Sequence, residues 1–144
     1  MKIVLDTDVV VAALRSPSGA SAELVRLARH GRISLAASVS LFIEYESVCT
    51  RQEHLAAAGL APGDVHCFLD ALASFIEPVP IHFLWRPQLH DPADELVLEA
   101  AVNAGADALL SFNLRHFRHV APRFGLRLSQ PGLFLQDYFG GIRS

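Results

Sequence analysis

Acidic residues follow or open several of the regular elements that the sequence predicts. Asp6 comes directly after the apolar run Lys2–Leu5, which has the pattern of a buried parallel strand. Glu44 lies on a predicted helix after the second strand, and Asp91 and Asp94 share one face of a later helix start. Ligands of parallel sheets gather beyond the carboxyl ends of the strands, so we expect these acids at one rim. Carboxylates gathered there repel each other unless a divalent cation lies between them, and the pattern therefore predicts a metal site.

Each of these acids also has an ordinary structural interpretation. Asp6 alone is compatible with a turn or a helix cap, and Asp94 alone with the first turn of a helix, where acids are common. Glu44 lies between Ile43 and Tyr45, and Glu46 nearby is compatible with a solvated face. Only the shared position at one rim of the sheet favours the metal site over these alternatives.

Further polar residues are expected at the same rim. Ser111 and Asn113 follow a second predicted strand, and Asp8 lies two residues after Asp6. A carboxylate site of this kind suits Mg²⁺ or Mn²⁺, which take oxygen ligands, retain several waters and act on phosphate substrates. None of the seven histidines has HExxH spacing, and we expect His116 and His119 to flank the rim or to pack outside it.

Contacts with a phosphate substrate would come from arginine. Lys2 is the only lysine, so eleven of the twelve Lys and Arg residues are arginines, whose planar fork suits phosphate oxygens. Arg15, Arg115 and Arg118 adjoin the predicted rim and are the substrate-binding candidates, with a solvated surface as the alternative for each. Phe112 could stack on a base, although a phenylalanine more often lies in a core or an interface.

Strands and helices alternate along the chain, which favours a parallel sheet covered on both faces. The sequence thus predicts an α/β fold with three layers, α/β/α, and a central, mainly parallel sheet. The strands are expected at residues 2–5, 33–36, 107–111 and 126–129, with an edge or connecting piece at 81–85. The helices are expected at residues 9–14, 20–30, 38–48, 51–58, 62–75, 91–104 and 131–139.

The composition predicts one domain with a sizeable core over residues 1–144. Of the residues 51% are hydrophobic and 19% are charged, so some apolar surface is expected at an oligomer or partner interface. Leu24, Leu27 and Ala28 are expected in the core, and the residues that compete for it on the next helix are Leu41, Ile43, Tyr45 and Val48. Cys49 and Cys67 are expected as buried free thiols.

Charge and hydropathy exclude several classes of protein. The net charge is −3, so bulk electrostatics do not predict a nucleic-acid-binding protein. No apolar stretch is long enough to span a membrane. Asp6 and Asp8 interrupt the apolar N-terminal run, which export signals do not tolerate, and a cytoplasmic location is expected.

Four segments resemble the PIN-domain nucleases, in order and over nearly the whole chain, and most closely the prokaryotic toxins of toxin–antitoxin pairs. They are IVLDTDVVVAAL, SLFIEYESVCTR, DPADELVLEAAVNAGADALLSFNLRHF and FGLRLSQPGLFLQDYF. The run DPxDExxLxxA, followed by a strand and a (T/S)xN turn, is the most specific piece.

The resemblance implies a PIN-like fold and assigns the acids. The first family acid matches Asp6, the second Glu44 and the third Asp94. The resemblance thus implies that these three are the catalytic and metal-binding residues, with Asp91 as a neighbouring metal ligand. The family hydroxyl matches Ser111. The family's usual Asn or Ser two residues after the first acid is here Asp8, and its fourth acid is here Asn113. Asp8, Ser111 and Asn113 are therefore supporting residues, and a second metal position depends on whether Asp8 or Asp91 replaces the missing charge.

The implied function is that of a metal-dependent endoribonuclease that uses Mg²⁺ or Mn²⁺, cleaves RNA, forms a homodimer and is held inactive by a cognate antitoxin protein. The alternative is a catalytically lapsed PIN-fold module that binds RNA or protein, with Asn113 as the sign of lost activity. A haloacid-dehalogenase-like phosphatase matches Asp6-Thr7-Asp8 but needs a lysine downstream, and Lys2 precedes the motif.

Overall fold

Five parallel strands form one sheet in the order β3-β2-β1-β4-β5. The computed structural model describes residues 1–84 and 88–143. The strands are β1 (Lys2–Leu5), β2 (Ser34–Ala37), β3 (Glu77–Pro78), β4 (Ala108–Leu110) and β5 (Arg127–Ser129). Residues Ile3 to Leu5 of β1 are buried and pair with β4, which places the most apolar run of the N-terminus at the centre of the sheet.

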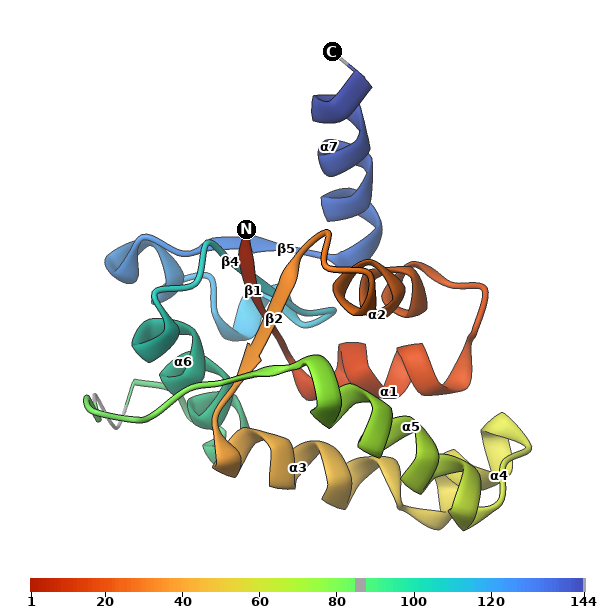
Figure 1. Cartoon of the computed structure of the whole chain (residues 1–144). Helices are drawn as coiled ribbons and strands as arrows, with labels where there is room; N and C mark the ends of the chain where they lie inside the picture. Colours follow the sequence, from red (N-terminus) through yellow and green to blue (C-terminus); the bar gives the residue numbers. More distant parts are fainter. Residues whose placement is uncertain (85–87, 144) are drawn as a thin grey trace.

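Helices cover both faces of this sheet, as the sequence predicts. They are α1 (Thr7–Arg15), α2 (Ala20–Arg29), α3 (Val39–Cys49), α4 (Gln52–Ala58), α5 (Pro62–Phe75), α6 (Pro92–Ala104) and α7 (Pro131–Arg143), with two 3₁₀ turns, η1 (Leu114–His116) and η2 (Ala121–Phe124). In Figure 1, α6 lies on one side of the sheet and α1 and α2 lie on the other. The expected three-layer α/β/α architecture is thus confirmed.

The edge of the sheet differs from the sequence prediction. The edge strand is Glu77–Pro78, whereas residues 81–84 form a connecting piece without strand structure and Trp85 lies outside the described residues. Pro78 lacks an N–H group and is tolerated because β3 is an edge strand. The backbone N–H groups of His82 and Phe83 both donate to Oδ1 of Asn103, at 2.9 Å, which fixes the connection against α6.

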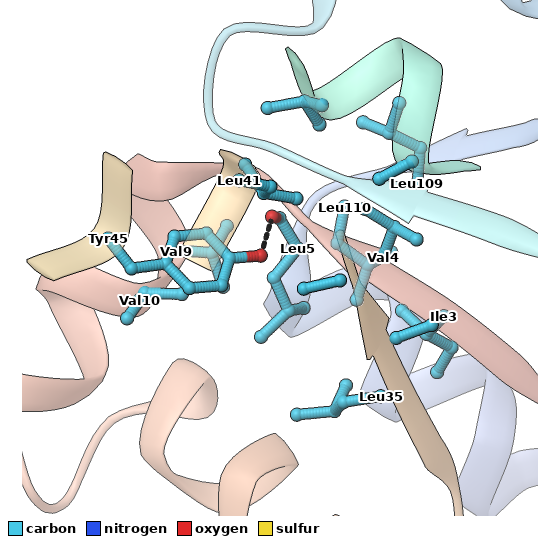
Figure 2. Close-up of a cluster of buried hydrophobic side chains, with 14 of the residues drawn as sticks. Ile3, Val4, Leu5, Val9, Val10, Leu35, Leu41, Tyr45, Leu109 and Leu110 are labelled. Atoms are coloured by element: carbon cyan, nitrogen blue, oxygen red, sulfur yellow. Dashed lines mark hydrogen bonds between the residues drawn. The ribbon is translucent and has the colours of Figure 1, made fainter. Parts of the chain in front are cut away.

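A hydrogen bond in the core joins α3 to the end of β1. The Tyr45 hydroxyl donates to the carbonyl oxygen of Leu5 at 2.6 Å, within a cluster that includes Val9 and Leu41 (Figure 2). Tyr45 is fully surrounded by protein, and burial raises the pKa of its hydroxyl well above the usual value. The bond therefore fixes the helix that carries Glu44 beside the strand that delivers Asp6.

Burial decides which residues of α3 enter the core, and one prediction of burial, that of Cys67, is wrong. Leu24, Leu27, Ala28, Leu41 and Tyr45 are buried and Val48 is half-buried, as expected, but Ile43 is 57% exposed. Ile43 lies on the same outer face of α3 as the exposed Val39, four residues earlier. This helix is apolar on more than one face, so its sequence alone does not show which face is buried. Cys49 is buried, whereas Cys67 is exposed on α5. Among the described residues, no helix has the length and apolar character needed to cross a membrane.

Candidate active site

Asp6 lies at the point where β1 ends and α1 begins. Its Oδ1 accepts a hydrogen bond from the backbone N–H of Thr7 at 2.8 Å, so it is the N-cap of α1. Its Oδ2 accepts a bond of 2.6 Å from the hydroxyl of Ser111, which follows β4. Burial raises the pKa of Asp6, and the bonds from Ser111 and Thr7 oppose that rise. Asp6 is therefore both a helix cap and a buried acid held in a fixed orientation by two neighbouring strand ends.

Asp8 faces the turn that contains Asn113. Its Oδ2 accepts hydrogen bonds from the backbone N–H of Phe112 at 3.1 Å and from the side-chain amide of Asn113 at 3.2 Å. Burial, followed by the negative charge of Asp6, raises the pKa of Asp8 to about 7. Position 113 thus carries an amide where the family resemblance implies an acid. This amide is in hydrogen-bond contact with the acid at position 8.

Asp94 lies in the first turn of α6 and faces both Asp6 and a histidine. Burial raises the pKa of Asp94, and the charges of Asp6 and Asp91 raise it further. His116 opposes this rise, since its Nδ1 lies 3.0 Å from Oδ2 of Asp94. Asp91 is the N-cap of α6 and accepts from the backbone N–H of Ala93 at 2.9 Å. The charge of Asp91 raises the pKa of both Asp6 and Asp94, so these three acids, expected at one rim, lie near one another.

Glu44 adjoins this group through a cavity that runs along α1, which we call the α1 cavity. It has a volume of about 760 Å³. Its lining residues are Thr7, Asp8, Val11, Ala12, Arg15, Ser16, Glu44, Val48, Arg51, His54, Asp91, Ala93 and Phe112. Glu44 therefore shares one cavity with Asp8 and Asp91, whereas neither Asp6 nor Asp94 lines it.

A second cavity of about 330 Å³ adjoins the acids, and we call it the η1 cavity. It is lined by Leu89, His90, Asp91, Asp94, Arg115, His116 and His119. Asp91 lines both cavities, so the two cavities adjoin at this residue. His116 and His119 flank the rim, as expected, but the contact between His116 and Asp94 was not predicted from the sequence.

The predicted substrate-binding arginines are not all at these cavities. Arg15 lines the α1 cavity and Arg115 lines the η1 cavity. Arg118 lines a different cavity, together with apolar residues of η2 and β5. Phe112 is 45% exposed at the α1 cavity rather than buried in the core. The sequence did not predict Arg51, at the start of α4, or His54 on α4 as site residues, because neither belongs to a recognisable motif.

Polar atoms left unsatisfied concentrate at the α1 cavity. Among the described residues, the buried side-chain atoms without a hydrogen-bond partner are Oγ1 of Thr7, Oδ1 of Asp8 and Nδ1 of His54. All three residues line the α1 cavity. A buried polar atom without a partner costs about 1–3 kcal/mol, so its presence calls for a ligand or a functional reason.

The chemistry of these acids suits a hard divalent cation. They offer carboxylate oxygens, which Mg²⁺ and Mn²⁺ prefer, and Oδ1 of Asp8 has no other partner. As the side chains stand, no group of three or more His, Cys, Asp or Glu in the described parts of the chain is arranged to hold an ion. Mg²⁺ requires only one or two protein carboxylates beside water and substrate oxygens, so the donor set still suits it.

A family model described as the PIN domain matches residues 2–115. This match covers most of the chain and includes every acid described above. The chain belongs to the PIN domain family. The predicted family and the predicted PIN-like fold are therefore confirmed. At family level, the match supports a nuclease.

One solved structure with the same fold is a crystal structure of VapBC2 from Rickettsia felis, bound to a DNA fragment from its promoter. The similarity covers 90% of this PIN domain and 98% of that chain, with a TM-score of 0.61 and 16% sequence identity. No curated protein matches the sequence. At this identity the solved structure shows that the fold is shared.

Proposed function

We propose that the chain, as one domain over residues 1–144, is a metal-dependent endoribonuclease and the toxin of a toxin–antitoxin pair. The observation that carries this proposal is the group formed by the buried acids Asp6 and Asp94 and the half-buried Asp8, whose pKa values are all raised, beside an open cavity. Buried acids that repel one another are costly to a fold, and they concentrate at functional sites.

The acids have distinct parts in this proposal. Asp6, Glu44 and Asp94, with Asp91, would hold Mg²⁺ or Mn²⁺. The ion, when bound, neutralises charge on the scissile phosphate and activates water for attack on phosphorus. Ser111 fixes the carboxylate of Asp6, and His116 fixes that of Asp94. Such fixed orientation supports catalysis because the site needs no rearrangement during the reaction.

Hydrolysis adds one water across a phosphodiester bond. The water oxygen bonds to phosphorus, the bond from phosphorus to the ribose oxygen breaks, and a proton from the water ends on that leaving oxygen. Arg15 lines the α1 cavity and Arg115 lines the η1 cavity, and both cavities include Asp91, so each arginine is a candidate to bind a phosphate oxygen of a strand that lies along the acidic group. Arg118, at a different cavity, has no part in this arrangement.

Asn113 bears on the alternative, a lapsed PIN-fold module that only binds RNA or protein. The family's acid at this position is missing, but the carboxylate of Asp8 contacts the amide of Asn113. We infer that the acid and the amide have exchanged places and that the charge of the site is preserved. This exchange favours an active nuclease over the lapsed module.

The deciding experiment is an RNA cleavage assay with the purified protein. We expect cleavage in Mg²⁺ or Mn²⁺, none in chelator, and a loss of at least about a hundredfold in Asp94→Asn, as for removal of one group that stabilises a developing charge. Asp70→Asn, a change of the same type on the exposed outer surface of α5, should cleave as the wild type does. Cleavage that is equal in all three proteins, or that persists in chelator, would contradict the proposal.

The antitoxin is proposed as a small protein whose inhibitory segment places a basic side chain among the acids. The likeness of the fold to VapBC2 supports such a partner. Expression of the chain alone should slow bacterial growth, and Asp94→Asn should relieve the effect. Equal toxicity of both forms would exclude nuclease action as its cause.

A homodimer and a cytoplasmic location complete the proposal. Val39 and Ile43 form an exposed apolar pair on α3, in keeping with the low content of charged residues, and they are candidates for the contact between two copies. Sedimentation analysis should show a dimer that dissociates more readily in Ile43→Ser. A monomeric wild type would remove the homodimer from the proposal.

A further inference from the structure

The α1 cavity has an acidic end and a cationic end. Asp8 lies at the start of α1 and Arg15 at its end, and both line the cavity. The separation of seven positions corresponds to about 10 Å along the helix axis. Charge therefore changes sign along the cavity, from the proposed reaction site to a point about 10 Å away.

Arg51 and His54, at the start of α4, lie at the same end, where Arg51 adds a second cation. Arg51 precedes α4 and His54 lies three residues later, so both project from the same side of its first turn. Both line the cavity together with Arg15. Within the part of the chain that the structure describes, the guanidinium groups of Arg15 and Arg51 have no acidic partner. Nδ1 of His54 is buried without a hydrogen bond, and its Nε2 lies 3.8 Å from Oε1 of Glu53.

The wall between the two ends is apolar. Val11 and Ala12 of α1 face the cavity from one side and Val48 of α3 from another, with Phe112 exposed at its margin. A flat aromatic ligand suits this wall, since stacking on an aromatic side chain stabilises single-stranded bases by about 1–3 kcal/mol. The order along the cavity is thus acid, apolar wall, cation.

We propose that the α1 cavity binds one nucleotide of a single-stranded RNA, with its base on the wall formed by Val11, Val48 and Phe112. The phosphate on one side of this nucleotide is the scissile one, at the acids. The phosphate on the other side lies on Arg15, Arg51 and His54. The inference rests on the proposed ribonuclease function and assigns Arg51 and His54 as substrate-binding residues.

A paired strand does not fit this arrangement as well as a single strand. A base can reach the apolar wall only when it is unstacked, which single-stranded loops and ends permit. A peptide segment can also carry an acidic and an apolar side chain, but it has no repeat of phosphate, base and phosphate to match the three parts of the cavity. The cavity therefore favours single-stranded RNA as the substrate class.

The test is the binding of a short, fluorescently labelled single-stranded RNA in chelator, measured by anisotropy at several salt concentrations. Arg51→Gln should weaken binding about tenfold, as for loss of one charge-assisted hydrogen bond. It should also reduce the slope of log K against log salt by about 0.7, the contribution of one phosphate in single strands. Arg15→Gln should behave in the same way, and Arg29→Gln, an exposed arginine on α2, should match the wild type.

A second probe tests the apolar wall. An RNA of the same length without its bases should bind the wild type more weakly, and it should lose less affinity in Val48→Ser than the intact RNA does. Melting curves of each variant confirm that it is folded. In cleavage assays with Mg²⁺, Arg51→Gln should raise KM and leave kcat within about twofold, since the interaction is made before and during the reaction alike.

The outcomes separate this inference from the proposed function. RNA binding that depends on Arg51, without cleavage in any metal, supports the nucleotide site and removes the nuclease. Cleavage with unchanged KM and unchanged salt slope in both Arg51→Gln and Arg15→Gln overturns the nucleotide site and leaves the nuclease. Tighter binding of a duplex than of the single strand also overturns it.

Discussion

The hydroxyl of Tyr45 donates a hydrogen bond of 2.6 Å to the carbonyl oxygen of Leu5 and so joins α3 to the end of β1 (Figure 2). The next residue on the strand side is Asp6, and the preceding residue on the helix is Glu44. One buried bond therefore sets the position of two acids that lie far apart in the sequence.

Tyr45→Phe should remove this bond at almost constant volume. The expected loss of unfolding free energy is on the order of 1–2 kcal/mol, because a buried carbonyl group loses its donor. Urea denaturation measures the loss, and RNA cleavage should fall with it because Glu44 is less firmly positioned. Tyr138→Phe is the matched control, since that hydroxyl makes an exposed bond of 3.4 Å to Arg32, and it should change stability by less than about 0.5 kcal/mol. Equal effects of the two variants would argue against a special role for the Tyr45 bond.

The metal-free protein should lose stability as the pH rises through the acidic range. The pKa of Asp8 is about 7 in the fold, against 3.8 for an unperturbed group. The native state therefore binds a proton that the unfolded chain has already released, and its stability falls between about pH 4 and pH 7. The difference in pKa corresponds to at most about 4 kcal/mol, and solvent around the half-buried carboxyl screens part of this effect. The raised pKa values of Asp6 and Asp94 act in the same direction.

Denaturation in chelator at several pH values measures this effect. Asp8→Asn should flatten the profile and be more stable than the wild type near neutral pH, whereas Asp70→Asn should follow the wild type. A wild-type stability that rises from pH 4 to pH 7 would show that these acids are paired rather than strained.

Added Mg²⁺ or Mn²⁺ should stabilise the wild type, and Asp94→Asn should lose most of this response. A metal ion that binds only the native state raises the free energy of unfolding by about 2.7 kcal/mol at a hundredfold excess over Kd. In chelator, the same variant should be as stable as the wild type or slightly more so, since one repelling charge is removed. Melting curves with and without metal decide between this and a capping role. If Asp94 were only a capping acid, its replacement would lower the free energy of unfolding by about 0.3–1 kcal/mol under both conditions.

Exchange of Asp8 and Asn113 should preserve the site. Asn113→Asp alone places a second carboxylate against Asp8 and should destabilise the metal-free protein. Asp8→Asn alone should weaken the response to metal. The double variant restores one acid and one amide in contact, so its stability and its metal response should return toward those of the wild type. A double-mutant cycle measures the coupling, expected at about 0.5–3 kcal/mol for residues in contact. Purely additive effects would contradict the exchange of roles.

Local sequence determined the elements that carry the acids. The apolar run before Asp6 and the Asp91-Pro92 start of α6 predict a strand end and a helix start, and both lie where they were expected. Hydrophobic periodicity and capping residues depend on neighbours within a few positions, so one sequence suffices to interpret them. The resemblance to PIN-domain nucleases added the family and its acids at Asp6, Glu44 and Asp94.

Other features depended on contacts between distant segments. Periodicity alone could not show that Ile43 is exposed, because α3 is apolar on several faces and its packing against α1 and the sheet selects the buried one. Arg51 and His54 resemble ordinary surface residues of α4 until that helix packs against α1 and brings them into the cavity that contains Asp8. The contact of 3.0 Å between His116 and Asp94 likewise joins η1 to α6. These contacts arise from burial of the whole core, which no short segment encodes, and so only the tertiary structure decided them.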